Sequence, residues 1–454
     1  MSAIPLSYND NLFLLADRFR NQPYFVCLDS GHPSGPDLIT STPIVWIEKN
    51  ESGTILYKNL KDNSSYDMAP SSTDLLQLIT DLHGRLIKNP ADPWQPSIMG
   101  SVAFEAGYDY NFIQGVSGSD SKPTDYNSFQ FGLYSWALVA NHEFETLSLV
   151  ISNNCPDWLA QRIQTLIATP IYSQDTFELM APFKKLMSKE NYLLNLSKID
   201  RYIQLGDCYQ VNYTQRLTAP YCGDPWLAFK KIRNTVKTPF SVYFDADSEQ
   251  LLSHSPERFL KVTNNHVETK PIKGTRKRSS DLTEDLRLAN ELENSAKDRA
   301  ENVMIVDLLR NDLGRTAVPG SVRVPALFRL ESYQNVHHLV STVTATLNDQ
   351  FHAFDCFLQA FPGGSITGAP KKRAMEVIHE LEPHERGPYC GSFFYWDASN
   401  KFDSNIMIRT LVTKDNMMSV WGGGGIVADS IATEEYEESL VKIENLIQIL
   451  EDDL

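Results

Sequence analysis

Features that point to secretion, to a structural metal or to a membrane are scarce in this chain of 454 residues. Its six cysteines are scattered and form no C-x-x-C pair, so we expect neither a zinc site nor a disulfide framework but free thiols in a reducing compartment. The N-terminus has no basic segment followed by an apolar run, so we expect no signal peptide. No apolar run is long enough to span a bilayer. The expected free thiols predict a cytoplasmic protein.

Excess positive charge is absent as well. The formal net charge is −16, whereas proteins that bind nucleic acids or anionic membranes are usually basic, so neither partner is expected. We also find no internal repeat and no low-complexity tract. What the sequence does contain is 42% hydrophobic and 11% aromatic residues, which suits a globular protein with a large core.

Two regions of the chain differ in pattern. Residues 1–150 are rich in short β-branched and aromatic runs that predict strands. Residues 188–450 alternate between the two periodicities, with helices predicted at 188–206, 225–235 and 433–450. The mixture predicts an α+β fold with large, mostly antiparallel sheets, in which the two regions form one intertwined unit.

A lysine stands at the end of four predicted strands. Runs at 240–244, 251–253, 259–263 and 266–271 are expected to form an antiparallel meander that ends at Lys273.

The neighbours of Lys273 favour reactivity. Ile272 precedes it and Gly274 follows it in a predicted turn, so the stem of the lysine should be packed while the glycine lets a ligand approach. Positive charge at 276–278 and partial desolvation both lower the pKa of a lysine, which is how a lysine becomes a nucleophile near neutral pH. A surface lysine in a turn is the alternative.

Two predicted helices each offer a pair of carboxylates three residues apart. Asp298 and Glu301 lie in the first turns of a helix that Ser295 would cap. Glu435 and Glu438 lie off the apolar stripe of the final helix. If the two helices meet, the four carboxylates suit Mg²⁺, which prefers carboxylates, water and substrate oxygens. An ion pair with an arginine and a solvated acidic face are the respective alternatives.

Further residues suit an anionic ligand. Four glycines at 422–425 can present their N–H groups as an anion-binding nest, or can form a tight turn. Glu257 precedes Lys273 and is either a general acid or the ion-pair partner of Arg258. Arg409 is a single arginine in an otherwise apolar predicted strand, so it needs a carboxylate from the protein or from a ligand.

Seven motifs, in order, resemble those of the chorismate-utilising enzyme family. They are Gly-Asp-Cys-Tyr-Gln-Val-Asn at 206–212, Ser-Pro-Glu-Arg-Phe at 255–259, Pro-Ile-Lys-Gly-Thr-Arg at 271–276, Asp-Arg-Ala-Glu-Asn at 298–302, Val-His-His-Leu-Val-Ser at 336–341, Gly-Ser-Ile-Thr-Gly-Ala-Pro-Lys at 364–371 and Gly-Gly-Gly-Ile-Val-Ala-Asp-Ser at 423–430. The N-terminal part matches more weakly. The resemblance implies an anthranilate synthase component I-like sandwich of two large antiparallel sheets with helices outside.

Two positions distinguish members of that family. Anthranilate synthases resemble this chain but typically carry Ala where Lys273 stands, whereas members that aminate chorismate and keep its pyruvyl group carry lysine. Members that add water use a lysine in the strand after the 206 turn, where this chain has Gln210. The resemblance therefore implies ammonia as the nucleophile. An anthranilate synthase, and a non-catalytic sensor of chorismate or tryptophan, are the alternatives.

The resemblance also implies a mechanism that yields 4-amino-4-deoxychorismate, a precursor of p-aminobenzoate in folate biosynthesis. Lys273 would attack C2 of chorismate, Glu257 would protonate the departing C4 hydroxyl, and His338 would position or polarise the ring. Mg²⁺ is expected on Glu301 and Glu438, with Asp298 and Glu435 supporting it through water. The residues expected to bind the substrate are Gly274, Tyr389, Arg409, Gly423, Gly424, Gly425 and Lys442.

Ammonia would have to come from elsewhere. The run at 206–210 does not have the Gly-x-Cys-x-Gly form of a glutaminase nucleophile, so the resemblance implies a heterodimer with a separate glutamine amidotransferase subunit. The N-terminal region resembles the part of the family that binds tryptophan. The match at 28–30 is partial, and a tryptophan near Ser30 and Ser34 is the expectation there.

Overall fold

The structure of the chain is a computed structural model. The parts that it describes are residues 3–8, 12–31, 35–50, 53–60, 64–68, 72–110, 126–169, 175–332, 336–452 and 454.

Two large sheets dominate the fold, and every strand pair in the described residues is antiparallel. The first sheet has thirteen strands. In spatial order they are β1 (Ile4–Leu6), β10 (Thr146–Ile151), β9 (Trp136–Asn141), β3 (Pro36–Thr40), β2 (Val26–Asp29), β14 (Phe240–Asp245), β15 (Gln250–Ser255), β24 (Thr410–Lys414), β25 (Met417–Ile426), β13 (Gln210–Gly223) and β11 (Phe177–Leu179), with β12 (Lys184–Lys185) and β21 (Gly368–Ala369) also paired to β13.

The second sheet has twelve strands. In spatial order they are β18 (Ile272–Lys277), β20 (Val336–Thr346), β17 (His266–Thr269), β16 (Arg258–Thr263), β23 (Phe402–Asn405), β22 (Ser392–Asp397), β7 (Ser97–Val102), β8 (Phe129–Tyr134), β4 (Val45–Lys49), β5 (Ile55–Asn59) and β6 (Ser64–Met68), with β19 (Arg323–Ser332) also paired to β20.

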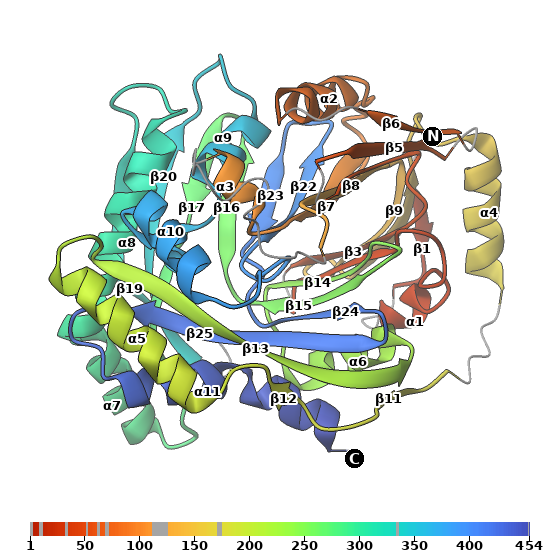
Figure 1. The fold of residues 1–454 in the computed structure, drawn as a ribbon. Coiled ribbons are helices and arrows are strands. Elements are labelled where there is room, and N and C mark those ends of the chain that lie inside the picture. The colour runs from red at the N-terminus through yellow and green to blue at the C-terminus, as the bar shows by residue number, and fades with distance from the viewer. Residues whose placement is uncertain are drawn as a thin grey trace.

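Helices lie on the outside of this arrangement (Figure 1). Figure 1 shows α5 and α11 side by side along β13 and β25, and both helices contact these strands. The helices are α1 (Phe13–Ala16), α2 (Ser72–Gly84), α3 (Ala106–Tyr110), α4 (Asp157–Ala168), α5 (Lys189–Gln204), α6 (Pro225–Thr235), α7 (Leu282–Glu293), α8 (Ala296–Gly314), α9 (Ala353–Ala360), α10 (Lys371–Leu381) and α11 (Ala432–Glu451), with a short 3-10 turn, η1 (Gly364–Ile366).

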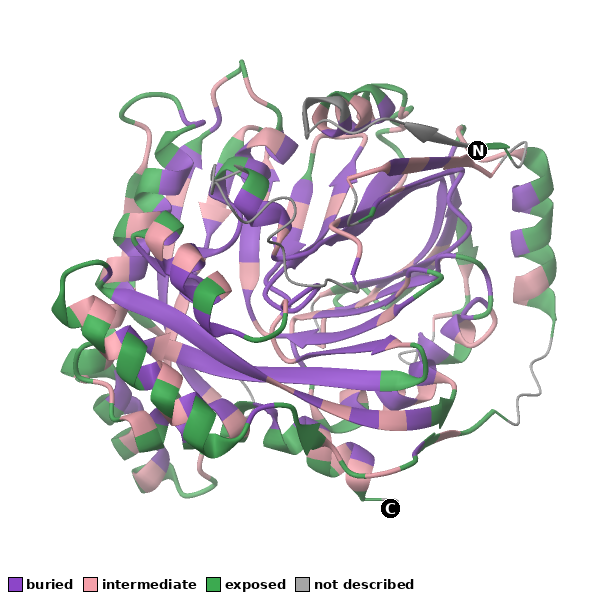
Figure 2. Cartoon of the chain, in the orientation of Figure 1, coloured by how far each residue is buried: buried purple, intermediate pink, exposed green. Residues whose placement is uncertain are grey.

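Both sheets mix strands from the two regions of the sequence. Strand β2 pairs with β14 in the first sheet, and β7 pairs with β22 in the second. The buried apolar side chains form one continuous core that spans both regions, and Figure 2 shows buried residues along the strands of both sheets. Aromatic contacts join the layers, for example between Phe244 and Phe393, whose ring centroids lie 5.2 Å apart. The division of the sequence at 1–150 and 188–450 stays a prediction.

Local signals explain where the predicted helices begin. The Ser188 hydroxyl caps α5 by accepting a hydrogen bond from the backbone N–H of Asn191. Asp224 caps α6, and Pro225 occupies its first turn, where no N–H partner is lost. Ser295 caps α8 as expected. The helices predicted at 188–206, 225–235 and 433–450 are thus confirmed.

The four strands predicted before Lys273 are present, but the prediction that they form one meander is wrong. Strands β14 and β15 pair within the first sheet, whereas β16 and β17 belong to the second. Strand β18 pairs with β20 and not with β17. The chain crosses between the sheets at the residues around Glu257, and this crossing places that carboxylate between the layers.

Three local expectations also need correction. Lys273 and Gly274 lie within β18 rather than in a turn, because the φ of +83° at Gly274 is absorbed by an irregular register between Ile272 and Thr275. The glycines at 422–425 lie inside β25 and pair with β13, so they form a strand and not a nest. Arg409 lies outside any strand, at the residue before β24, with a φ of +52°.

Two expectations about the environment can be compared with the structure. All six cysteines are free thiols, as predicted. Within the described ranges, none of the helices combines the length and the apolar character needed to cross a membrane.

Candidate active site

Lys273 is the first component of the site. Its side chain is half-buried on β18, and its Nζ lies 3.5 Å from the carbonyl oxygen of Ser365. Burial lowers the pKa of Lys273, and the nearby charge of Lys442 lowers it further, although the carboxylates of Glu301 and Glu257 oppose the shift. A lysine with a lowered pKa holds more of the neutral amine, which is the nucleophilic form.

Glu257 lies beside this lysine. It occupies the crossing between β15 and β16, is 5% exposed, and accepts a hydrogen bond of 3.0 Å from the Ser365 hydroxyl. Burial raises the pKa of Glu257 to about 7, against the lowering effects of Lys273 and Ser365. The carboxyl group therefore carries a proton over much of the neutral range and can donate it.

His338 is placed on β20 opposite Thr275 of β18. Its Nδ1 lies 2.9 Å from the Thr275 hydroxyl. Burial lowers the pKa of His338 to about 4, and the positive charge of Arg409 adds to this effect. The imidazole is therefore neutral at physiological pH, so it can donate or accept a hydrogen bond without adding charge.

Arg409 is a half-buried cation whose guanidinium makes no ion pair with any residue of the described chain. Burial is the cause of its lowered pKa. Its backbone carbonyl accepts a hydrogen bond from the N–H of His254, which fixes the loop before β24. A partly desolvated guanidinium without a protein carboxylate is suited to a carboxylate of a ligand.

The first carboxylate pair lies on α8. Burial raises the pKa of Glu301, and the negative charges of Asp298 and Glu435 contribute to the rise. The Asp298 carboxylate packs against Gly274, where its Oδ1 lies 2.9 Å from the point that a Cβ at this glycine would occupy, and it is 3.5 Å from Arg276 Nη2. The pair therefore lies next to the strand that carries Lys273.

The second carboxylate pair lies on α11. Glu435 is buried and accepts a hydrogen bond from the Ser430 hydroxyl. Glu438 is bound by Lys442, at 2.7 Å between Oε1 and Nζ. Burial acts to raise the pKa of Glu438, but the positive charges of Lys442 and two further lysines outweigh it and lower the pKa overall.

The four carboxylates share one region but do not yet form a coordination sphere. Charges on α8 and α11 influence one another, since Glu435 acts on Glu301, and Lys297 of α8 lies 3.8 Å from Glu435. Across the described parts of the chain, no three acidic, histidine or cysteine side chains are gathered closely enough to hold a metal ion. The donor chemistry fits a hard cation such as Mg²⁺, because all four groups are carboxylates.

The glycine strand closes another side of the site. A Cβ at Gly424 would lie 3.3 Å from Glu435 Oε2 and 3.4 Å from Lys442 Nζ, so the backbone of β25 approaches these groups closely. Lys442 Nζ also donates to the Gly423 carbonyl at 3.0 Å. Tyr389 is buried and stacks on Trp421 of the same strand, with ring centroids 5.6 Å apart.

Gln210 lies against this strand as well. Its side chain is fully buried, and its amide has no hydrogen-bond partner among the residues that the structure describes. A Cβ at Gly425 would lie 2.9 Å from Gln210 Nε2, which places the amide at the inner end of the glycine strand.

Two predicted residues lie elsewhere or outside the description. Ser30 lines a cleft of about 970 Å³ between the sheets, together with Leu28, Phe240 and Asn405. Its hydroxyl donates to Asp37 at 2.9 Å. Ser34 lies outside the described residues.

The sequence reasoning missed Ser365, which contacts both Glu257 and Lys273. Its position inside a Gly-Gly-Ser turn before a helix was the one available signal. Gly364 in this turn packs against α8, where a Cβ would lie 2.5 Å from a methyl carbon of Leu308. Serine is common in such turns, so only the fold reveals its contacts.

The chain is similar to several known proteins. A family model described as chorismate binding enzyme matches residues 36–448. Aminodeoxychorismate synthase component 1 of Escherichia coli (strain K12) is 38% identical over 442 residues, which cover 96% of this chain and 95% of that protein. Anthranilate synthase component 1 of Geobacillus stearothermophilus is 33% identical and covers 90% of this chain and 84% of that protein.

A solved structure has the same fold as this chain. Anthranilate synthase component I from Streptococcus pneumoniae TIGR4 superposes with a TM-score of 0.78 at 26% identity, covering 92% of this chain and 93% of that one. The fold class expected from the sequence is thereby confirmed.

Proposed function

Because this chain belongs to the chorismate binding enzyme family, we propose that it aminates chorismate at C4 with ammonia and releases 4-amino-4-deoxychorismate and water. The observation that carries this proposal is the arrangement of Lys273 and Glu257 around Ser365. A neutral lysine and a protonated carboxyl group side by side are the two groups that an addition with loss of a hydroxyl requires. The named relative in Escherichia coli supports the choice of reaction.

The reaction divides into two displacements. The Lys273 amine forms a bond to C2 of chorismate while the C4–O bond breaks, and Glu257 gives its proton to the departing hydroxyl, which leaves as water. Ammonia then forms a bond to C4, and the C2–N bond to Lys273 breaks as the ring double bonds return. Glu257 is reprotonated by the proton that ammonia gives up.

The carboxylates of chorismate need positive charge and N–H donors. We assign this role to Arg409, Tyr389 and Lys442, together with Gly274 and the backbone at Gly423, Gly424 and Gly425. The half-buried guanidinium of Arg409, which makes no ion pair within the described chain, supports the assignment. Burial keeps His338 neutral, so its imidazole is less suited to bind a carboxylate than the cationic side chains are. We therefore assign His338 to the ring of the substrate.

The metal proposal rests on the donor set. Glu301 and Glu438 would hold Mg²⁺ directly, and Asp298 and Glu435 would hold its water ligands. When bound, Mg²⁺ would supply a positive charge that binds the ring carboxylate. The lysines that now lie among these carboxylates, Lys297 and Lys442, indicate that the region attracts cations.

Gln210 favours ammonia over water. A lysine at this position would be a base able to activate water, whereas an uncharged amide cannot take a proton at neutral pH. The buried Gln210 amide without a protein partner suits a small neutral nucleophile such as ammonia.

We also infer a partner and a compartment. The relatives that match are named as component 1, and this chain has no glutaminase motif, so a separate glutamine amidotransferase subunit would deliver ammonia. Six free thiols suit the cytoplasm.

Anthranilate synthase component I is the second candidate, and the 33% identity to such an enzyme favours it. That reaction would eliminate pyruvate and would not need Lys273. A non-catalytic sensor is the third candidate, but binding alone would not require an amine and a carboxyl group whose pKa values are both displaced toward neutrality.

Tryptophan is proposed for the cleft between the sheets. Its walls include Leu28, Phe240 and Phe393, which suit an aromatic ring, and Ser30 and Asp37 offer polar groups at one side. A crystal grown without added tryptophan that shows only packed protein side chains in the cleft would remove this proposal.

Product analysis tests the function directly. The purified chain is incubated with chorismate, Mg²⁺ and an ammonium salt at mildly alkaline pH, with and without aminodeoxychorismate lyase. We expect p-aminobenzoate with the lyase alone. Anthranilate without the lyase would establish the second candidate, isochorismate or salicylate would overturn the role of Gln210, and bound but unchanged chorismate would favour the sensor.

Lys273→Ala tests the nucleophile. We expect loss of most of the activity, and loss of the protein adduct that wild type forms with chorismate when ammonia is withheld. Such an adduct has the mass of the protein plus chorismate minus water. Lys270→Ala is the matched control, because Lys270 lies three residues away and pairs with Glu331 at 3.6 Å. Wild-type turnover in Lys273→Ala would exclude the covalent role.

A further inference from the structure

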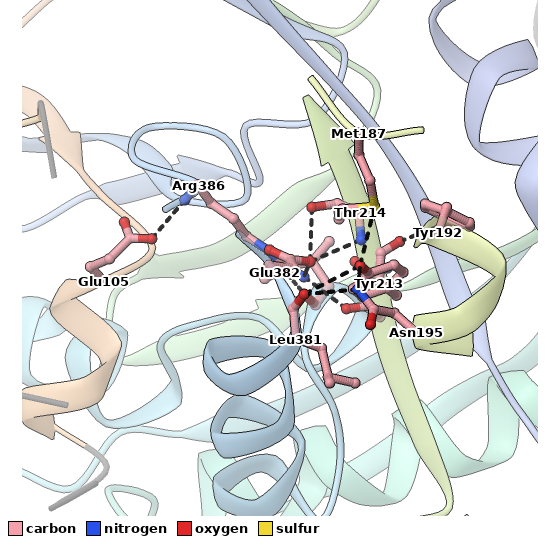
Figure 3. Close-up of polar contacts among 11 residues, drawn as sticks. Glu105, Met187, Tyr192, Asn195, Tyr213, Thr214, Leu381, Glu382 and Arg386 are labelled. Atoms are coloured by element: carbon pink, nitrogen blue, oxygen red, sulfur yellow. Dashed lines mark hydrogen bonds and ion pairs between the residues drawn. The ribbon is translucent and has the colours of Figure 1, made fainter. Parts of the chain in front are cut away.

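A buried arginine lies behind the candidate active site. Arg386 follows α10 and is 1% exposed. Its Nε and Nη2 donate to the Glu382 carboxylate at 2.9 and 2.7 Å, and this pair is drawn at the centre of Figure 3. The guanidinium then has N–H groups left over, because it carries five of them in a fixed plane.

The remaining donors reach two backbone carbonyls. Nη1 donates to the carbonyl of Ile366 at 2.8 Å, and Nη2 donates to the carbonyl of Asn212 at 2.7 Å. Ile366 ends the turn η1, whereas Asn212 belongs to β13. Arg386 therefore ties a turn to a strand that is more than 150 residues away along the chain.

Both tied elements belong to the candidate active site. Ser365, the neighbour of Ile366, donates to Glu257 and accepts from Lys273. Asn212 pairs with Gly425 of the glycine strand, and its N–H donates to the Thr367 carbonyl just after η1. A shift of Arg386 would thus move the contact of Ser365 with the carboxyl group that donates the proton.

Arg386 itself is held from several directions. Glu105 accepts hydrogen bonds from the backbone N–H of Arg386 at 2.8 Å and from that of Gly387 at 3.0 Å, and Figure 3 shows its carboxylate directed at Arg386. The ring of Phe104 lies 4.4 Å from the guanidinium carbon. Glu382 is fixed in turn by the N–H and hydroxyl of Thr214.

Arg386 makes more hydrogen bonds than its ion pair with Glu382 requires. A buried guanidinium could satisfy its charge with Glu382 alone, and a lysine would do so as well. The planar fork is required only because it reaches the two carbonyls at the same time. Those carbonyls lie on the turn beside the catalytic carboxyl group and on the strand beside the glycine run.

We propose that Arg386 is a positioning residue for the amination of chorismate. Arg386 holds η1 against β13, and Ser365 in η1 thereby keeps Glu257 directed at the substrate. The inference rests on the proposed function. Glu105 supports Arg386 from the N-terminal region, so residues of both sequence regions fix the proton donor.

Arg386→Lys tests the proposal. Lysine keeps the charge beside Glu382 but cannot reach both carbonyls, so we expect kcat to fall on the order of 100-fold, the loss that a misplacement of about 1 Å causes. KM for chorismate should change less than kcat, because Arg386 contacts none of the side chains assigned to the substrate. Wild-type kcat in this variant would overturn the proposal.

Arg20→Lys is the matched control. Arg20 is also buried and pairs with two carboxylates, those of Asp175, which precedes β11, and Asp224, which caps α6, and neither belongs to η1. We expect it to lose thermal stability and to keep kcat. Equal losses of kcat in Arg20→Lys and Arg386→Lys would mean that destabilisation alone explains the effect, which contradicts the proposal.

A double-mutant cycle isolates the path through Ser365. If Arg386 acts by placing Ser365, then Arg386→Lys should cause little further loss of kcat in a Ser365→Ala background. Losses that multiply would show independent effects and overturn the proposal. If Arg386→Lys does not fold, Glu105→Gln takes its place, and a folded Glu105→Gln variant with wild-type kcat would have the same meaning.

The wild-type reaction is measured first in every series. If wild type forms no aminodeoxychorismate, the proposed function is wrong. If wild type is active and Arg386→Lys is equally active, only the positioning role is wrong.

Discussion

Burial moves the pKa values of the two proposed reactive side chains toward neutrality from opposite directions. It lowers the pKa of Lys273 and raises the pKa of Glu257 to about 7. Both shifts favour the forms that the reaction needs, because they increase the share of the neutral amine at Lys273 and of the neutral acid at Glu257. The opposite charges that they would carry in water are disfavoured in the same buried space.

Glu257→Gln separates activity from stability. Because the pKa of Glu257 is raised in the folded protein, its contribution to stability is present below about pH 4.3, the pKa of an unfolded glutamate, and is lost as pH rises through about 7. Glutamine stays neutral, so we expect the variant to be more stable than wild type at pH 8 and to lose about 10²–10⁴-fold in kcat. Urea unfolding of the variant and of wild type at pH 5 and pH 8 checks this prediction. A difference in stability between the two proteins that is the same at both pH values would contradict it.

Ser365→Ala should move the pH dependence. The Ser365 hydroxyl donates to Glu257 and thereby lowers the pKa of that carboxyl group, so its removal raises the pKa. The proton donor is active when neutral, and kcat/KM should fall above about pH 7 in wild type and at higher pH in the variant. The measurement requires a constant concentration of free ammonia across the pH series. An unmoved descending limb would assign that limb to another group.

At the scale of the element, β18 depends on one glycine. Gly274 has a φ of +83°, and a Cβ there would lie 2.7 Å from Leu292 and 2.8 Å from Asp298. Gly206 is the matched control, because its φ is +81° and nothing lies within 4 Å of its Cβ position. A comparison of alanine substitutions at these two glycines therefore separates the effect of the contacts around Gly274 from that of backbone strain.

Gly274→Ala should cost more than Gly206→Ala. Both substitutions introduce the strain of a left-handed residue, about 1–3 kcal/mol, but Gly274→Ala also displaces the Asp298 carboxylate and the start of α8. We expect a lower Tm and reduced activity for Gly274→Ala, and a lower Tm alone for Gly206→Ala. Indistinguishable variants would mean that β18 and α8 can separate without consequence.

Local chemistry decided which elements could be predicted from the sequence. Helix α6 is found where the sequence places it, because Asp224 and Pro225 are signals within the helix itself. Strand β18 was mistaken for a turn because Gly274 is a turn residue by composition, while its partner β20 lies some 60 residues further on. The glycine strand was misread for the same reason, since pairing with β13 keeps it extended.

The site divides in the same way. Lys273, Glu257 and His338 could be selected because each has a distinctive side chain within a motif, and the fold brings Lys273 and Glu257 to Ser365. Ser365 and Arg386 could not, since their roles depend on contacts with residues 108 and 174 positions away. No periodicity or spacing in one sequence reports such contacts.

At the scale of the whole molecule, the proposed glutamine amidotransferase partner can be tested through the source of ammonia that the chain can use. We expect the purified chain to use ammonium salts and to be inactive with glutamine. Addition of a glutamine amidotransferase subunit should restore the reaction with glutamine. Turnover with glutamine by the chain alone, after removal of traces of ammonia, would contradict the proposed heterodimer.

The exchange of strands between the two sequence regions constrains how the chain is made. During synthesis, β2 emerges long before its neighbour β14, and β7 emerges long before β22. Until the later strands are made, one edge of each early strand has no partner for its backbone hydrogen bonds. Contacts of such large sequence separation slow folding and expose the nascent chain to aggregation. We therefore expect a ribosome-bound fragment of residues 1–150 to need a chaperone, and a chain cut after residue 150 to regain its fold only when both pieces refold together.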